Sequence, residues 1–260
     1  MGRLTKIMAG AIGAALLLAG CASPNQGDNV YGTIKSGVLT MCADVPYPPF
    51  ELEDSSAPTG YSGFDVEILT AIAEELGMTL EVVDSDFDAL QSGLTLGAGQ
   101  CDVGASAITI TDKRKANIDF SDPYYDSLQS LLVAKNSGIT SLEDLVGKSV
   151  AVQTGTTGEI YANKNAPAGV EIVSFPSDGE LWPAIQAGQV QGILQDYPVN
   201  NQHAKDDAGY VVVAQYPTDE HYGIALAKDK NPELLKYINE ALKEIRDNGT
   251  YDRIYDKYFS

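Results

Sequence analysis

Strand-like and helix-like segments alternate along most of this chain, and that alternation limits the possible folds more than any other feature. Short apolar segments that suit buried strands are followed by segments with helical spacing or capping patterns. Such alternation favours mainly parallel sheets covered by helices, and its two separate sets predict two α/β lobes. The first set is strand 37–44, helix 64–77, strand 80–84, helix 88–99 and strand 101–108; the second is helix then strand over 142–155, helix 156–165, strand 171–175, helix 180–188 and strand 190–196.

Capping residues and apolar spacing locate the ends of the two clearest helices. Asp65 is the predicted N-cap of helix 64–77, and Gly77 is its predicted end. Asn231 and Pro232 mark the start of a C-terminal helix, because Asn is a favoured cap and Pro suits the first turn. Both helices have an apolar face at helical spacing: Ile68, Leu69, Ile72 and Leu76 in the first, and Leu234, Leu235, Ile238, Leu242 and Ile245 in the second.

Residues 1–20 have the pattern of a secretory signal peptide. A basic start precedes an apolar run, residues 7–19, that is too short for a comfortable membrane span. The run ends in "LAGC", which resembles the bacterial lipobox and implies cleavage before Cys21 and lipidation of that cysteine. The alternative is an ordinary signal peptide followed by a chance cysteine. Residues 21–29 are polar with Pro and Gly, so they are predicted to form a flexible tether.

The formal charge of -19 restricts the partners of the protein. Such a surface repels nucleic acid and anionic membranes, so neither is expected to bind, and membrane contact is expected only through lipid on Cys21. The charge slightly favours cationic or zwitterionic ligands. Cys42 and Cys101 either pair with each other outside the cytoplasm or remain buried thiols, and the sequence leaves both possibilities open.

Polar residues gather where predicted strands end, which is where open α/β sheets bind ligands. In "SAITITDKR", residues 106–114, Ser106 and Thr109 supply hydroxyls and Arg114 a guanidinium, a set that suits a small carboxylate. The alternative is a surface arginine beside a helix-capping threonine. Asp196 follows another apolar strand, where it would either accept hydrogen bonds from an ammonium group or occupy an ordinary turn.

Two further segments could contribute to the same site. In "VQTGTTGEIYAN" a strand ends at Gln153, and Thr156 and Glu159 have capping-box spacing, so a helix N-terminus there would attract an anion. A plain strand-to-helix turn is the alternative, and the segment lacks the lysine and spacing of a nucleotide-binding P-loop. In the Pro-rich loop after the first strand, Tyr47 could line a pocket, whereas Phe50 is better explained by packing.

Taken in order, these segments resemble the bacterial extracellular solute-binding proteins for polar amino acids, the binding components of ABC importers. The matching stretches span residues 30–260 and include "YPPFE", "GYSGFDVEIL", "GQCDVGASAITITDKRKANIDFSDPYY", "LVGKSVAVQTGTTGEIYA" and "ILQD". The resemblance implies a periplasmic-binding-protein-like fold with a discontinuous first lobe, residues 30–126 and 221–260, and a second lobe, residues 127–220. Chain crossings near residues 123–127 and 218–223 would act as hinges.

The resemblance also implies the role of each site residue. Arg114 would clamp a ligand α-carboxylate with help from Thr157, and Asp196 would bind the α-ammonium. Ser106, the backbone of Ala107, and Thr109 would contact these two groups. The remaining predicted binding residues are Asp44, which would meet a polar or cationic side-chain end, Tyr47 and Phe87, which would flank the side chain, and Gln153 at its strand end.

The implied protein is a lipid-anchored monomer on the outer face of the cell membrane. It would capture a free amino acid, cationic or neutral polar, for a cognate ABC permease without a cofactor or metal. One alternative is an enzyme resembling cyclohexadienyl dehydratases on the same scaffold, although the sequence shows no Ser-His-Asp or Cys-His set, and His203 and His221 are isolated. The other alternative is an amino-acid-sensing ectodomain.

Overall fold

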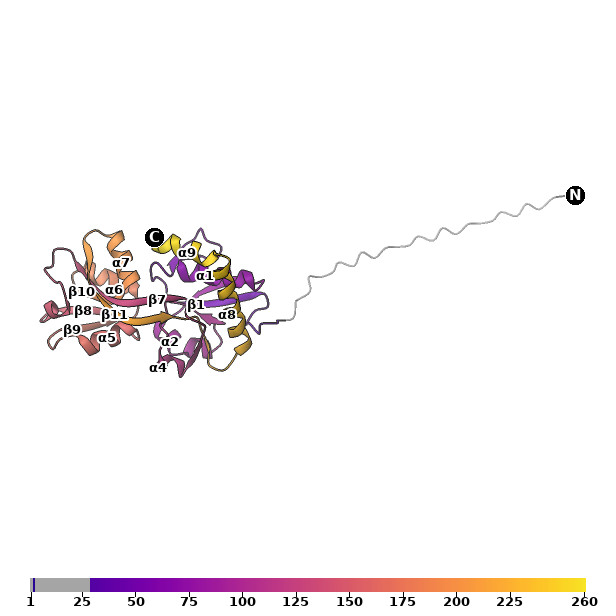
Figure 1. Ribbon diagram of the computed structural model, residues 1–260, viewed down its shortest axis with the longest axis horizontal. Helices are drawn as coiled ribbons and strands as arrows, with labels where there is room; N and C mark the ends of the chain where they lie inside the picture. The colour runs from indigo at the N-terminus through magenta and orange to yellow at the C-terminus, as the bar shows by residue number, and fades with distance from the viewer. Residues whose placement is uncertain (1, 3–28) are drawn as a thin grey trace.

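Two five-stranded sheets lie side by side in the computed structural model, which describes residues 2 and 29–260 (Figure 1). The predicted signal peptide, Cys21 and nearly all of the predicted tether fall outside the described residues. The first sheet has the order β4 (Thr79–Asp84), β1 (Val38–Ala43), β5 (Val103–Gly104), β12 (Ala225–Ala227), β6 (Ile118–Phe120); the second has the order β11 (Tyr210–Tyr222), β7 (Tyr125–Ala134), β10 (Gly192–Asp196), β8 (Ser149–Gln153), β9 (Glu171–Phe175).

The predicted α/β class is confirmed, but both sheets are mixed rather than mainly parallel. β1 pairs in parallel with β4 and β5, and β8 with β9 and β10, as the strand–helix alternation predicts. The antiparallel pairs involve β6, β7, β11 and β12. These strands were not in the predicted alternation, because they form where the chain passes from one sheet to the other and back.

Helices cover both faces of each sheet. Successive side chains of a strand point to opposite faces, so a strand whose residues are all buried needs cover on both. In the second sheet Val150 and Val152 face a cluster with Ala162 of α5 (Thr157–Asn165), whereas Ala151 faces α6 (Asp178–Gln186). In the first sheet the strands pack against α1 and α8 on one side and α2 and α3 on the other. The bounds are α1 Phe64–Glu75, α2 Phe87–Gln91, α3 Leu94–Gly97, α4 Asp112–Lys115, α7 Tyr197–Asp206, α8 Pro232–Asp247 and α9 Thr250–Phe259, with a 3-10 turn at Leu142–Leu145 and a hairpin of β2 (Leu52–Glu53) and β3 (Tyr61–Ser62).

Three local predictions need correction. The helix predicted over residues 88–99 is broken into α2 and α3 at Gly93, whose φ of 84° no continuous helix contains. The strand predicted over residues 101–108 is regular only in β5, and irregular backbone follows it. Asp65 is not a cap, because α1 starts at Phe64 after Gly63 and the Asp65 side chain turns into the core instead.

β7 and β11 are the segments by which the chain enters and leaves the second sheet. They pair antiparallel, with Tyr125 opposite Tyr222 and Ser127 opposite Glu220, so the two predicted crossings lie beside each other. The pairing shifts register between Tyr216 and Glu220. In Figure 1 both strands run through the middle of the molecule between the two groups of helices. No helix in the described residues is long and apolar enough to cross a membrane.

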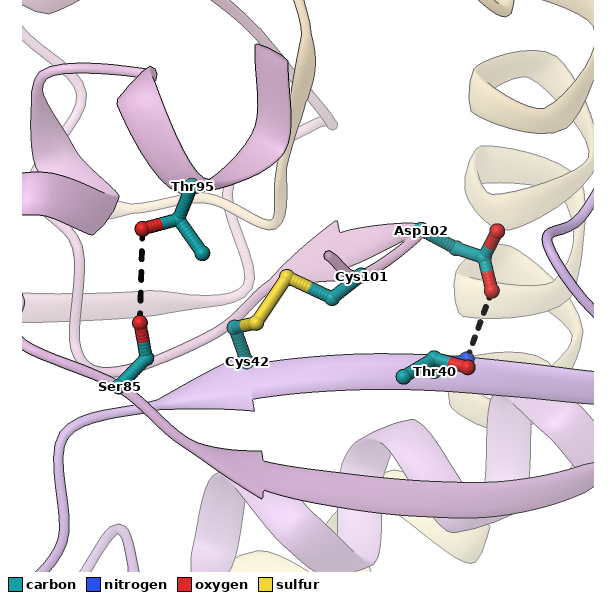
Figure 2. The surroundings of a disulfide bond; sticks show 6 residues. All are labelled: Thr40, Cys42, Ser85, Thr95, Cys101 and Asp102. Carbon is teal, nitrogen blue, oxygen red and sulfur yellow. Dashed lines mark hydrogen bonds between the residues drawn. A yellow bond between two sulfur atoms is a disulfide. The ribbon is translucent and has the colours of Figure 1, made fainter. Parts of the chain in front are cut away.

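A disulfide links the first two strands that border the functional site (Figure 2). Cys42 of β1 and Cys101, just before β5, are bonded across a separation of 59 residues. In the chain-entropy account, closing a loop of that length lowers the entropy of the unfolded chain by an amount worth about 4 kcal/mol of stability. Asp102 adds a second link by accepting a hydrogen bond from the Thr40 N–H at 2.8 Å. The bridge therefore holds the carboxyl end of β1 against the segment that leads into β5.

Candidate functional site

A cavity lies between the two sheets, bordered by the carboxyl ends of β1, β5, β8 and β10. Parallel strands bring their carboxyl ends to one edge of a sheet, so polar residues far apart in sequence meet there. The structure brings all ten predicted binding residues to this one cavity and adds Thr156. The lining is Asp44, Tyr47, Phe87, Ser106, Ala107, Thr109 and Arg114 from one side, and Gln153, Thr156, Thr157 and Asp196 from the other.

Arg114 is the buried cation of the cavity. It lies on the short helix α4, whose N-cap Thr111 accepts a hydrogen bond from the Arg114 N–H, and its side chain is almost fully buried. The guanidinium donates from Nε to Gln91 Oε1 at 3.2 Å, from Nη1 to the Thr109 carbonyl at 2.8 Å and from Nη2 to the Gly155 carbonyl at 3.1 Å. Three of its five N–H groups are thus occupied by neutral acceptors.

Arg114 forms no ion pair with a carboxylate among the residues that the structure describes. Burial lowers the pKa of Arg114 to about 10, and the negative charges of Asp196 and Glu220 oppose that fall, so the group stays charged at neutral pH. The Phe87 ring lies 5.4 Å from its Cζ and offers only a weak cation–π contact. A buried guanidinium with two free N–H groups and no ion pair is a binding position for an anion.

Asp196 is the buried anion at the end of β10. Gln129 Nε2 donates to its Oδ1 at 2.5 Å, and the hydroxyl of Tyr222 donates to its Oδ2. Burial raises the pKa of Asp196 to about 7, the charge of Glu220 adds to the rise, and the two hydrogen bonds oppose it. A cation that bound here would restore the ionised form.

Asp44 is a second buried acid, at the end of β1. Its Oδ2 accepts a hydrogen bond from Gln153 Nε2 at 2.5 Å, which joins the two sides of the cavity. Burial raises the pKa of Asp44 to about 7 despite that hydrogen bond, and the charges of Asp84 and Asp86 contribute. Asp44 can therefore hold a proton near neutral pH, and a cationic partner would favour its ionised form.

Ser106 and Ala107 follow β5 and are held from beneath the cavity. The Ser106 hydroxyl donates to Glu51 and accepts from the Asp44 N–H at 3.1 Å. Ala107 has a φ of 47°, unusual for a residue with a Cβ, and its N–H donates to Asp65 Oδ2 at 2.8 Å. The Ser106 hydroxyl proton and the Ala107 N–H are thus used within the protein, which leaves the serine oxygen and the alanine carbonyl for a ligand.

Glu220 is a site residue that the sequence analysis missed. Thr109 and Thr157, from opposite sides of the cavity, donate their hydroxyl protons to Glu220 Oε2 at 2.8 and 2.7 Å. Gln129 Nε2 and the Thr218 hydroxyl donate to Oε1 at 3.0 and 2.7 Å. A hydroxyl has one proton, so both threonines present lone pairs to the cavity. The only sequence signal was an acidic residue within a predicted crossing, which does not reveal where its side chain points.

The start of α5 supplies backbone donors. The Thr156 hydroxyl caps the helix by accepting from the Glu159 N–H at 3.0 Å, so the predicted N-terminus is confirmed. The predicted capping box is altered, because Glu159 Oε2 accepts from the N–H of Gly155 instead of that of Thr156. Thr156 and Thr157 both line the cavity, so the positive end of the helix faces it.

The aromatic residues divide as the sequence suggested. Tyr47 and Phe87 line the cavity, and both are nearly buried. Phe50 is fully buried and packs edge-on against Phe64 and Tyr222, as expected for a core residue. The cavity thus combines apolar walls with one guanidinium and two carboxyl groups, and Glu220 lies behind Thr109 and Thr157. A small zwitterion with an additional positive charge complements that arrangement.

Comparisons with known proteins agree with this geometry. The family model of the bacterial extracellular solute-binding proteins, family 3, matches residues 39–260. A probable histidine-binding protein of Neisseria gonorrhoeae is 31% identical over 252 residues, 95% of this chain and 92% of the relative. The L-arginine-binding protein of Pseudomonas aeruginosa is 35% identical over 240 residues, 85% of this chain and 90% of the relative.

A solved structure shows the same fold at higher identity. An ancestral arginine-binding protein bound to arginine is 39% identical and superimposes with a TM-score of 0.79 over 86% of this chain and 99% of that chain. The match of the family model to most of the chain agrees with the ordered strand-end motifs and with the cavity that they form. The chain therefore belongs to the bacterial extracellular solute-binding proteins, family 3.

Proposed function

We propose that this protein captures an amino acid with a cationic side chain in the cavity and delivers it to an ABC importer. The observation that carries the proposal is the Arg114 guanidinium, which is buried, retains two free N–H groups and has no ion pair among the described residues. A ligand carboxylate supplies the missing anion through two parallel hydrogen bonds. The N–H groups at the start of α5 add donors to the same carboxylate.

The other end of the zwitterion is bound by acceptors. Asp196 accepts hydrogen bonds from the α-ammonium. The Thr109 oxygen, whose proton goes to Glu220, can accept a further hydrogen bond from the same ammonium. Asp44, with Gln153 beside it, pairs with the positive end of the side chain, while Tyr47 and Phe87 enclose its apolar part. The histidine- and arginine-binding names of the relatives support a cationic ligand.

Binding rather than catalysis fits the use of the charged groups. Arg114 and Asp196 are assigned to the ligand's carboxylate and ammonium and Asp44 to its side chain, so each of these charged groups of the lining has a binding role. The reported relatives are named as binding proteins. We therefore propose a transport role in preference to an enzyme or a sensory ectodomain, with a permease as the macromolecular partner of a monomer.

Loss of Arg114 should abolish binding. Arg114→Ala removes both free donors, and we expect the binding free energy of L-arginine to weaken by about 2–5 kcal/mol in calorimetry. Arg253→Ala, on the C-terminal helix and away from the cavity, is the matched control. Thermal melting of both variants checks the fold. Near-native affinity in a folded Arg114→Ala protein would remove the basis of the site assignment.

Affinity for L-arginine should rise with pH. Asp44 and Asp196 both have pKa values raised to about 7, so each is partly protonated below neutral pH, and a cationic ligand requires both to ionise. Binding should strengthen as pH rises toward about 7, by up to about tenfold per pH unit for each carboxyl that loses a proton, and then level off. L-glutamine requires only Asp196 to ionise, so its dependence should be shallower.

Asp44→Asn tests which carboxyl meets the side chain. The substitution should weaken L-arginine more than L-glutamine and reduce the pH dependence of L-arginine by one proton. Asp252→Asn, at an exposed position on α9 that is not on the cavity lining, is the control. Equal losses for the two ligands would show that Asp44 does not bind the cationic end.

Ligand should also close the two lobes, residues 30–126 with 221–260 and residues 127–220, about the paired crossings. Arg114 and Asp196 belong to different lobes, so one zwitterion satisfies both only when the lobes approach. We expect small-angle scattering to show a smaller radius of gyration with L-arginine, and a smaller change in Asp196→Ala. Asp219→Asn, an exposed neighbour of Glu220, is the control. No contraction of the native protein would refute the closure.

Cys21 should be the lipid-bearing mature N-terminus, which would anchor the protein on the outer face of the membrane. The proposal rests on the lipobox-like "LAGC" and the extracellular family. Mass spectrometry of protein from its native membrane should find residues 1–20 removed and diacylglycerol on Cys21. An unmodified Cys21, or cleavage at another bond, would contradict it.

A further inference from the structure

Two buried carboxyl groups beside Ser106 and Ala107 have no basic partner within the part of the chain that the structure describes. Glu51 and Asp65 are both 0% exposed. Each uses one oxygen in hydrogen bonds: Glu51 Oε1 accepts from the Ser106 hydroxyl, and Asp65 Oδ2 accepts from the Ala107 N–H and the Tyr124 hydroxyl. The other oxygen of each, Glu51 Oε2 and Asp65 Oδ1, is buried and has no hydrogen-bond donor.

The backbone brings these two side chains to the same place. The Asp65 N–H donates to the Phe50 carbonyl at 3.0 Å, so Asp65 starts beside the peptide that leads into Glu51. Gly63 permits this approach, because a Cβ there would lie 2.1 Å from the same carbonyl. The two side chains then end on consecutive residues, Ser106 and Ala107. Both unbonded oxygens therefore lie in the same buried region and lack a donor there.

One proton shared by the two carboxyl groups would give both unbonded oxygens a hydrogen bond and would remove the repulsion between two negative charges. Two buried carboxylates side by side repel each other, whereas an acid and a carboxylate form a strong hydrogen bond. Asp65 Oδ2 accepts hydrogen bonds from two donors, which favours the ionised form of Asp65. Glu51 Oε1 accepts from only one donor, so the proton is expected on Glu51. Burial raises the pKa of Asp65 to about 7 and that of Glu51 well above its ordinary value, and the charge of Asp65 adds to the second rise.

The groups around the pair favour its protonation. Asp44, beyond Ser106, adds negative charge that favours protonation of Glu51. Tyr124 and Tyr47 face the same region, and burial raises both of their pKa values well above the ordinary range, so both stay neutral. No basic side chain of the described residues is among the groups that shift the pKa of Glu51 or Asp65.

We infer that Glu51 and Asp65 share one proton between Glu51 Oε2 and Asp65 Oδ1, and that this acid–carboxylate pair positions the Ser106–Ala107 segment of the cavity. Through Ser106 it fixes the hydroxyl that holds the Asp44 N–H, and through Ala107 it stabilises the backbone at a φ of 47°. The positioning role rests on the proposed amino-acid binding, whereas the shared proton does not.

Infrared spectroscopy tests the proton without a ligand. At about pH 8, where free carboxyls are ionised, the native protein should show a protonated-carboxyl C=O band that Glu51→Gln lacks. The control Asp102→Asn removes a partly buried acid away from the pair and should keep that band. Identical native and Glu51→Gln spectra would overturn the inference.

Unfolding measurements supply a second test. The folded native protein would keep a proton that the unfolded chain releases above about pH 4.3, so its stability falls as pH rises. The unfolding constant of native protein should therefore rise by about one extra factor of ten per pH unit relative to Glu51→Gln between roughly pH 5 and 7. Parallel pH profiles would count against the shared proton.

The double variant Glu51→Gln/Asp65→Asn tests the geometry. Each single amide can place its NH₂ group toward the facing oxygen, but the double variant either sets two donors against each other or breaks a bond to Ser106 or Ala107. Its destabilisation should exceed the sum of the single losses, and additive losses would refute the facing arrangement.

L-arginine affinity tests the positioning role. Glu51→Ala should weaken binding by about tenfold, and Glu51→Gln should restore most of that loss because it keeps the acceptor for Ser106. Equal affinities of Glu51→Ala and native protein would overturn positioning. If native protein failed to bind any amino acid, the proposed function would fall, while the infrared and unfolding results would still decide the shared proton.

Discussion

The burial of the Arg114 guanidinium without an ion pair sets the charge balance on which the rest of the cavity depends. Removing a cation from water costs several kcal/mol, and the neutral acceptors Gln91, Thr109 and Gly155 offset only part of that cost. Asp196 and Glu220 act on it at longer range, through a cavity of reduced dielectric. The two free N–H groups of the guanidinium can therefore donate to an anionic group of a ligand.

The cavity draws its hydrogen-bond donors and acceptors from two separate sheets. The Cys42–Cys101 bridge ties the carboxyl end of β1 to the segment before β5, and the carboxyl ends of β8 and β10 supply Gln153 and Asp196. β7 and β11 are the paired strands that join the two sheets, and Glu220 on β11 receives hydroxyl protons from both sides. The connecting strands thus take part in the chemistry of the site.

Sequence reasoning predicted residues that line the cavity, because the signals that place them are local. A capping threonine places Arg114 on α4, another places Thr157 at the start of α5, and apolar strands end at Asp44 and Asp196. It failed where local signals conflict with distant contacts. Asp65 resembles a cap, yet the close approach of Gly63 to Phe50 turns it inward.

The sequence by itself determined the α/β class and the residues at strand ends, because periodicity and capping involve neighbours along the chain. Only the tertiary structure decided which group accepts the hydroxyl proton of each serine and threonine in the cavity. Thr109 and Thr157 give theirs to Glu220, and Ser106 gives its own to Glu51. Each of these hydrogen bonds joins residues more than fifty positions apart, and its direction depends on packing that no local pattern records.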